Sequence, residues 1–302
     1  MRNGKNGHIH EYVCALVLTA FKEDVSLEDI QDNLEDAWSD GLQYRGKYCD
    51  LYLGTSLKTY SQYFQDYFAG KVYDETIDRA LDFWLHEFDL KADYDEVYAD
   101  GGTGVKSDVT LRYKHRDVLY LSLKWKTKST FNQQTPGFKS MSNWTLFDPS
   151  LAEPAKEFGT QVSDLMGTGG DEPERNYKYA MDVFFEYLDD SFADMDPDNF
   201  VRAARKAITD GQNNTILVNL TPKDAEVYRF DTRSQQALRR KLSKGSWEVE
   251  EQHYKGDKCA ARIYTHTSGV VFKVDYNTKV STKSGNTREI VGHNARWTFI
   301  NI

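Results

Sequence analysis

The segment 101–128 constrains the fold of this 302-residue chain more than any other. Its apolar and polar residues alternate in two runs, and three polar residues, 114–116, separate the runs. Strict alternation on both sides of a polar turn predicts a β-hairpin. With 114–116 as the loop, Tyr113 pairs with Asp117.

This register determines which side chains share a face of the hairpin. Successive side chains of a strand point to opposite faces. One face therefore holds the apolar residues Val109, Leu111, Leu119, Leu121 and Leu123. The other holds Asp108, Thr110, Arg112, Tyr120, Ser122 and Lys124. A shift of one residue would place Asp108 among the leucines, where an unpaired charge is costly. We therefore expect the functional atoms of Asp108 and Lys124 to lie within about 6 Å of each other.

A carboxylate beside a lysine suits phosphodiester hydrolysis, because a bound metal ion can activate water while an ammonium stabilises developing charge. The residues SDVTL, a turn and LSLK resemble the PD-(D/E)xK nucleases. That family includes most type II restriction endonucleases, Holliday-junction resolvases and several recombination exonucleases. Ser122 stands where the family has Glu or Asp, as in the Ser-x-Lys variant of some restriction enzymes.

The resemblance implies a role for each residue of the motif. Asp108 would bind Mg²⁺, Lys124 would orient or activate the attacking water, and Ser122 would make a supporting hydrogen bond. An Asp at a strand start and a Lys on a solvated strand face also occur in hairpins without a site, so a non-catalytic hairpin stays open as an alternative.

Residues 9–22 are apolar nearly all round and predict a buried helix, which begins after the breaker Asn6-Gly7. Glu11 then falls in the first turn. Gly7 to Glu11 resembles the G-x-x-x-E pattern that opens the first helix of resolvases and many restriction enzymes, where the Glu points into the metal site. The resemblance implies Glu11 as a second Mg²⁺ ligand, directly or through water. The alternative is that Glu11 only complements the helix dipole. A separate metal site at His8 and His10 is disfavoured, because no HExxH or cysteine partner accompanies them.

Three further helices are expected before the hairpin. Ser26 to Asp29 predicts a capped helix that ends at Gly41, and two helices follow at about 57–69 and 75–88. The helix at 57–69 has a stripe of aromatic residues that favours core packing over stacking on bases. The helix at 75–88 has an apolar face of Ile77, Ala80, Leu81, Trp84, Leu85 and Phe88. Extended segments are expected at 42–53 and 96–100.

A polar segment follows the hairpin and contains donors that suit phosphate and base-edge contacts. We expect DNA contacts from Lys126, Lys128, Asn132, Gln133, Gln134 and Lys139. A structural loop would use similar residues, so that alternative also stays open.

The rest of the chain is helical and then rich in strands. Helices are expected at about 153–166, 175–192, 198–209 and 232–243, and strands at 215–220, 225–230, 247–253, 259–266, 269–276 and 288–301. The acids of 182–190 favour a solvated helix face over a metal cluster. The expected fold class is α/β, with a restriction-endonuclease-like mixed sheet flanked by helices. The expected regions are a nuclease core at 1–195 and an α+β region at 196–302 that contributes to DNA recognition.

Composition limits the class of protein. A net charge of −9 argues against a nonspecific nucleic-acid coat, whereas 104–140 holds eight bases against two acids. Three cysteines without a CxxC motif favour a reducing cytoplasm. No apolar run is long enough to span a bilayer, and no signal-peptide pattern opens the chain.

Together these features predict a Mg²⁺-dependent endonuclease, a type II restriction endonuclease that cuts a specific duplex DNA sequence and acts as a homodimer. One alternative is a phage or repair nuclease of the same superfamily, which cuts by DNA structure. Another is a non-catalytic DNA-binding or phage structural protein.

Overall fold

The computed structural model describes residues 2–36, 42–99, 107–125, 132–134, 198, 202, 212, 214–242, 246–254, 258–266, 270–282 and 288–299. The chain forms two compact units, of which unit 1 comprises 1–129 with 212–232, and unit 2 comprises 130–211 with 233–302. The expected regions 1–195 and 196–302 have a single boundary, whereas the chain passes between the units three times. A contribution of the C-terminal region to DNA recognition stays a prediction.

Unit 1 contains a mixed seven-stranded sheet in the order β1-β2-β3-β4-β5-β7-β8. Its strands are β1 Leu42–Arg45, β2 Asp50–Leu53, β3 Glu96–Ala99, β4 Val109–Tyr113, β5 Arg116–Trp125, β7 Thr215–Leu220 and β8 Ala225–Phe230. The pairs β2–β3 and β5–β7 are parallel, and the other neighbours are antiparallel. The sheet therefore joins the hairpin β4–β5 to a strand about ninety residues further along the chain.

Helix α1, Arg2–Glu23, contacts β2, β3, β4 and β5 along one face of this sheet. Every residue from Ile9 to Ala20 is buried, as the apolar pattern predicts. The predicted start after Asn6-Gly7 is wrong, because the helix begins at Arg2 and passes through Gly7. A glycine costs a helix only about 1 kcal/mol, which the packing of the buried turns outweighs.

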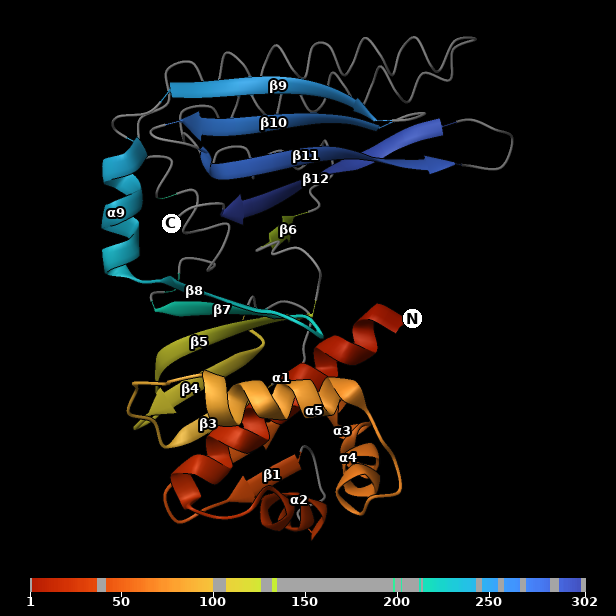
Figure 1. The fold of residues 1–302 in the computed structure, drawn as a ribbon, viewed down its shortest axis with the longest axis vertical. Coiled ribbons are helices and arrows are strands. Elements are labelled where there is room, and N and C mark those ends of the chain that lie inside the picture. The colour runs from red at the N-terminus through yellow and green to blue at the C-terminus, as the bar shows by residue number, and fades with distance from the viewer. Residues whose placement is uncertain are drawn as a thin grey trace. The chain divides into compact units, whose positions relative to one another are not determined.

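The remaining helices of unit 1 surround α1 and the small strands. They are α2 Leu27–Asp36, α3 Thr55–Lys58, α4 Ser61–Phe68, α5 Glu75–Asp82 and the π-helical turn η1 Phe83–Glu87. The cap of α2 is confirmed, since the Asp29 backbone N–H donates to Ser26 Oγ at 3.0 Å and the Ser26 N–H donates to Asp29 Oδ2 at 3.3 Å. Its predicted end at Gly41 lies outside the described residues. Helix α5 packs beside α1 (Figure 1).

Two predicted helices differ in detail from the structure. The helix expected at 57–69 is broken into α3 and α4, and its aromatic stripe packs against the core, with Phe64 fully buried. The helix expected at 75–88 ends in the π-turn η1. The wider turn changes the angular spacing, so Phe83 is buried and Leu85, predicted to face the core, is 51% exposed.

The hairpin β4–β5 has the predicted faces but a different turn. Tyr113 pairs with Arg116, not with Asp117, and the turn is the pair Lys114 and His115, with φ of 51° and 62°. Both positive φ values are typical of a two-residue hairpin turn. A bulge at Val118, between the pairs of Leu111 and Arg112, restores the predicted register, and Val109 lies opposite Leu121. All five predicted apolar residues of the inner face are buried.

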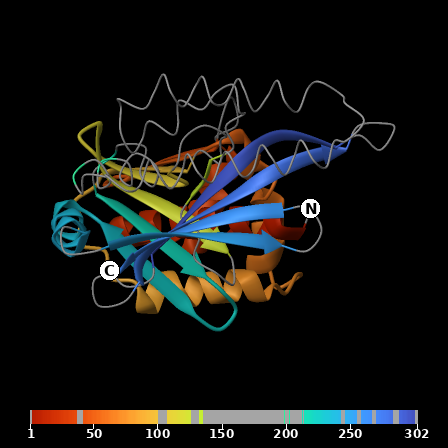
Figure 2. The ribbon, with the colours of Figure 1, turned by 90° about the horizontal axis from the view of Figure 1, so that it is seen from above.

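Unit 2 contains a five-stranded antiparallel sheet in the order β6-β12-β11-β10-β9. The strands are β6 Asn132–Gln134, β9 Ser246–Tyr254, β10 Lys258–His266, β11 Val270–Thr282 and β12 Arg288–Phe299. Figures 1 and 2 both show β9 to β12 as long strands side by side. This confirms the predicted meander. Helix α9, Thr232–Leu242, follows β8, as predicted.

The architecture is a mixed α/β fold whose seven-stranded sheet is flanked by helices. The helices expected at 153–166 and 175–192, and nearly all of the helix at 198–209, lie outside the described residues. Among the helices that are described, none is both long and apolar enough to cross a membrane.

Candidate active site

Asp108, Ser122 and Lys124 converge where β4 begins and β5 nears its end. Lys124 Nζ donates to Asp108 Oδ2 at 3.0 Å, which confirms the predicted proximity. Ser122 Oγ lies 3.4 Å from the same oxygen, and the backbone N–H of Leu123 also donates to it. The Asp108 N–H donates to the Leu121 carbonyl at 2.8 Å, which fixes the backbone at the entrance of β4. Three groups of β5 therefore contact the same oxygen of the Asp108 carboxylate.

Glu11 approaches this cluster from α1. Its side chain is buried, and His8 Nδ1 lies 3.3 Å from Glu11 Oε2. Because α1 begins at Arg2, Glu11 is in the third turn of the helix and not the first. The alternative that it only complements the helix dipole loses its basis, since that effect fades within the first turn.

The environment of Glu11 favours its protonated form. Burial and, to a lesser extent, the negative charge of Asp108 raise the pKa of Glu11 to about 8, against the opposing effect of the positive charge of Lys124. Without a cation, the Asp108 carboxylate pairs with Lys124, and the Glu11 carboxyl lies in a poorly solvated place close enough to sense both charges. A divalent cation beside both groups would favour the ionised form of Glu11 and release its proton.

His10 precedes Glu11 but belongs to the core. Its ring is fully buried between Trp84 and Trp125, with ring centroids 5.8 and 6.3 Å away. Burial lowers the pKa of His10 to about 3, although the nearby Lys124 backbone favours the charged form. A fully buried, neutral imidazole that packs against two tryptophan rings makes His10 a core residue.

The donors near Asp108 are those of an open Mg²⁺ site. No group of three or more His, Cys, Asp or Glu side chains arranged to hold a metal occurs in the part of the chain that the structure describes. Mg²⁺ in enzymes is commonly bound through one or two carboxylates, and waters and substrate phosphates complete its octahedron. Asp108 and Glu11, with Ser122 beside them, fit such an open site and do not fit a closed structural one.

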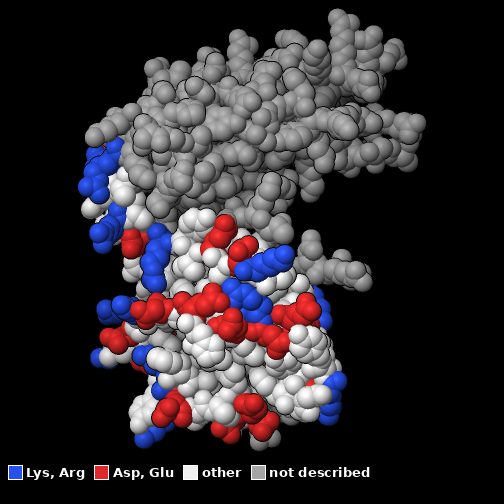
Figure 3. Space-filling model, in the orientation of Figure 1, with Lys and Arg blue, Asp and Glu red and all other residues white. Residues whose placement is uncertain are grey.

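Only three of the six predicted DNA-contact residues are among the described residues. Lys126, Lys128 and Lys139 lie outside the described residues. Asn132, Gln133 and Gln134 form β6, whose backbone pairs with Trp297, Arg296 and Ala295 of β12 in unit 2. DNA contact by these residues stays a prediction. Over the described part of the face in Figure 3, acidic and basic residues are interspersed.

One polar residue beside the cluster was missed from the sequence. Asn219 lies in the buried strand β7 directly opposite Lys124 of β5, and only 2% of it is exposed. Its sequence context, TILVNL, contains a single polar side chain after Thr215 in an otherwise apolar strand. That polar residue in a buried strand is the signal that could have identified it, because buried polar groups need partners.

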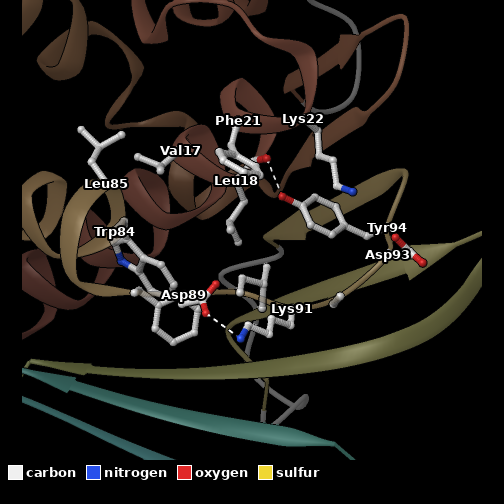
Figure 4. A pocket seen from close by; sticks show the side chains of 13 residues that line it. Val17, Leu18, Phe21, Lys22, Trp84, Leu85, Asp89, Lys91, Asp93 and Tyr94 are labelled. Carbon is white, nitrogen blue, oxygen red and sulfur yellow. Dashed lines mark hydrogen bonds and ion pairs between the residues drawn. The ribbon is translucent and has the colours of Figure 1, made fainter.

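A separate hollow of about 490 Å³ lies in unit 1 between α1, η1 and residues 88–94 (Figure 4). Its lining is largely apolar and includes Val17, Leu18, Trp84 and Phe88. Tyr94 Oη donates to the Leu18 carbonyl at 2.8 Å. None of the proposed catalytic residues lines this hollow. It is therefore a feature distinct from the candidate active site.

No model of a known protein family matches the chain, and no curated protein matches it in sequence.

Proposed function

We propose that the protein is a Mg²⁺-dependent endonuclease of the PD-(D/E)xK type that hydrolyses DNA phosphodiester bonds. The carrying observation is the contact of Lys124 with Asp108 at 3.0 Å, with the buried Glu11 carboxyl beside them. Mg²⁺, when bound, supplies Lewis-acid polarisation of the phosphate and a water of lowered pKa.

The other roles in the proposed reaction belong to residues of the chain. Asp108 and Glu11 would hold the cation, and the Leu123 N–H and Ser122 hydroxyl keep the Asp108 carboxylate oriented. Lys124 lies within hydrogen-bonding reach of the same carboxylate and can turn its ammonium to the attacking water or to a phosphate oxygen. Partial burial strengthens these electrostatic interactions relative to water.

More specifically, we propose that the protein is a homodimeric type II restriction endonuclease that acts on duplex DNA in the cytoplasm. The support is the Ser-x-Lys variant at Ser122 and Lys124 and a chain large enough to hold a sequence-reading part. Two-fold symmetry would present one active site to each strand of a symmetric target.

Digestion of a set of plasmids with and without Mg²⁺ tests whether the protein is a nuclease and whether it is a restriction enzyme. The inactive control is Lys124→Ala. Discrete fragments that persist at long incubation support the restriction enzyme. Cleavage confined to branched or damaged DNA supports instead a repair or recombination nuclease of the same superfamily. Inactivity on every DNA form with Mg²⁺ and Mn²⁺ overturns the nuclease proposal.

A further inference from the structure

Three adjacent strands of unit 1 carry a polar row that extends beyond the proposed catalytic residues. Lys124 of β5 lies opposite Asn219 of β7, and Asn219 lies opposite Glu226 of β8. Residues directly opposite each other on neighbouring strands share a face of the sheet. The row therefore runs from Asp108 through Lys124 to Asn219 and Glu226.

The hydrogen bond at the far end of the row fixes the orientation of the Asn219 amide. Asn219 Nδ2 donates to Glu226 Oε2 at 3.1 Å. An ionised carboxylate only accepts hydrogen bonds, so the NH₂ group must face Glu226. Because the amide oxygen and nitrogen point in different directions, Oδ1 faces away from Glu226, and Lys124 of β5 is the residue paired with Asn219 on the other side of β7.

An acceptor beside Lys124 has a definite use in the proposed reaction. In the structure the ammonium pairs with Asp108, with about a quarter of the Lys124 side chain exposed. When Asp108 is engaged by a cation, its charge is neutralised and Lys124 loses most of this partner. A partly buried ammonium without an acceptor is unfavourable and poorly ordered.

We infer that Asn219, oriented by Glu226, is a positioning residue that holds Lys124 when Asp108 binds the cation. The inference deepens the proposed function and rests on it for its catalytic meaning. Asn219 touches no reacting atom in this scheme. It keeps the ammonium directed at the water or phosphate and prevents it from turning to solvent.

The test uses the full-length chain without metal or DNA, with Asp108→Asn to imitate the loss of the carboxylate charge. The readout is the exchange rate of the Lys124 ammonium protons with water, from ¹H–¹⁵N spectra in which Lys124→Arg identifies the signal. Adding Asn219→Leu should accelerate exchange about fivefold to tenfold, the loss of one hydrogen bond.

Two matched comparisons separate positioning from a general disturbance. Thr215→Val changes the same face of β7 opposite Tyr120, where Thr215 Oγ1 has no hydrogen-bond partner among the described residues, and should leave exchange unchanged. Glu226→Gln keeps an acceptor for the Asn219 amide and should also leave it unchanged, whereas Glu226→Leu should accelerate it. Glu226 is exposed, so both variants are expected to fold.

An exchange rate in Asp108→Asn/Asn219→Leu within about twofold of Asp108→Asn alone overturns the inference, as does equal acceleration by Thr215→Val. Because the measurement needs no cleavage, it is independent of the proposed function. A chain that cuts DNA but shows no exchange effect loses only the positioning role. A chain that shows the effect but never cuts DNA keeps the positioning of Lys124 and loses the nuclease.

Discussion

The two ends of one sheet face differ in how their charges are balanced. Near the hairpin turn, Arg112 bonds Asp117 and lies over the Tyr98 ring at 4.1 Å, and Tyr98 stacks on Tyr52 at 4.2 Å. Arg45 completes the series, since it bonds Asp50 and lies over Tyr52. Each cation there has one carboxylate and one ring, an arrangement that favours stability.

At the other end of the face the charged groups are less exposed. Lys124 pairs with Asp108 at 3.0 Å, and Glu11, which lies beside His8, is buried deeply enough that its pKa is raised to about 8. A protein gains no stability from burying an ionisable carboxyl group away from water. Under the proposed function, the first cluster maintains the fold and the second serves the reaction, since perturbed ionisable groups concentrate at functional sites.

The largest expected effect separates the two ends directly. Lys124→Ala should lower single-turnover cleavage on the order of 10³-fold, because it removes a group that acts on the transition state. Arg112→Ala, the matched loss of a cation on the same face, should change cleavage by less than about twofold and lower the free energy of unfolding by about 1 kcal/mol. DNA binding in Ca²⁺ is the control for both. A comparable loss of cleavage in Arg112→Ala would show that the two ends of the sheet face do not differ in their effect on cleavage.

Glu11→Gln should lower cleavage on the order of 10²-fold or more at saturating Mg²⁺ while DNA binding is retained, since an amide is a weaker Mg²⁺ ligand than a carboxylate. The measurement is single-turnover cleavage on the substrate used for Lys124→Ala. If Glu11→Gln cuts at the parental rate, the resemblance of Gly7 to Glu11 to the nuclease pattern is coincidental.

In the absence of metal, Glu11→Gln should raise the free energy of unfolding, although it lowers cleavage when Mg²⁺ is present. The folded-state pKa of Glu11, about 8, exceeds the ordinary value of 4.5, so its contribution to stability is complete below about pH 4.5 and is lost as the pH rises through 8. Glu11→Gln should therefore be more stable than the parent at pH 8, on the order of 2–4 kcal/mol, and nearly equal at pH 4.5.

Urea unfolding of both proteins across that pH range measures the difference. The pKa of His10 is lowered to about 3, so its contribution to stability is lost as the pH falls from 6.5 towards 3, partly within this range. Parent and variant share His10, so its contribution cancels from their difference. A constant difference between parent and variant from pH 4.5 to 8 would contradict the burial of an ionisable Glu11.

Ser122→Ala should have the smallest effect on cleavage, a reduction of about tenfold or less. The Ser122 hydroxyl lies 3.4 Å from Asp108 Oδ2, a long hydrogen bond, and the Leu123 N–H still orients the carboxylate. Ser122→Glu should retain activity by supplying the acid usual in the resembled family. A reduction by Ser122→Ala as large as that by Glu11→Gln would assign the hydroxyl a more direct role.

Local patterns explain which parts of the fold were predictable. The faces of β4 and β5, the buried strand β7 and the meander β9 to β12 follow from alternation or apolar runs within a few residues. The two-residue turn at Lys114 and His115 was not predictable, because the bulge at Val118 compensates for it one pair further along. The π-turn η1 was missed because an α-helical period does not describe five residues of wider spacing.

The sequence by itself determined that Asp108 and Lys124 share a face and that α1 is buried, since both depend on neighbours along the chain. Only the tertiary structure decided that Glu11 lies in the third turn of α1 beside them and that Asn219 lies opposite Lys124. These contacts join residues about one hundred positions apart through the packing of a helix on a sheet and a parallel strand pair. No local periodicity specifies such pairings, because the free energy that selects them comes from burying surfaces that are distant in the sequence.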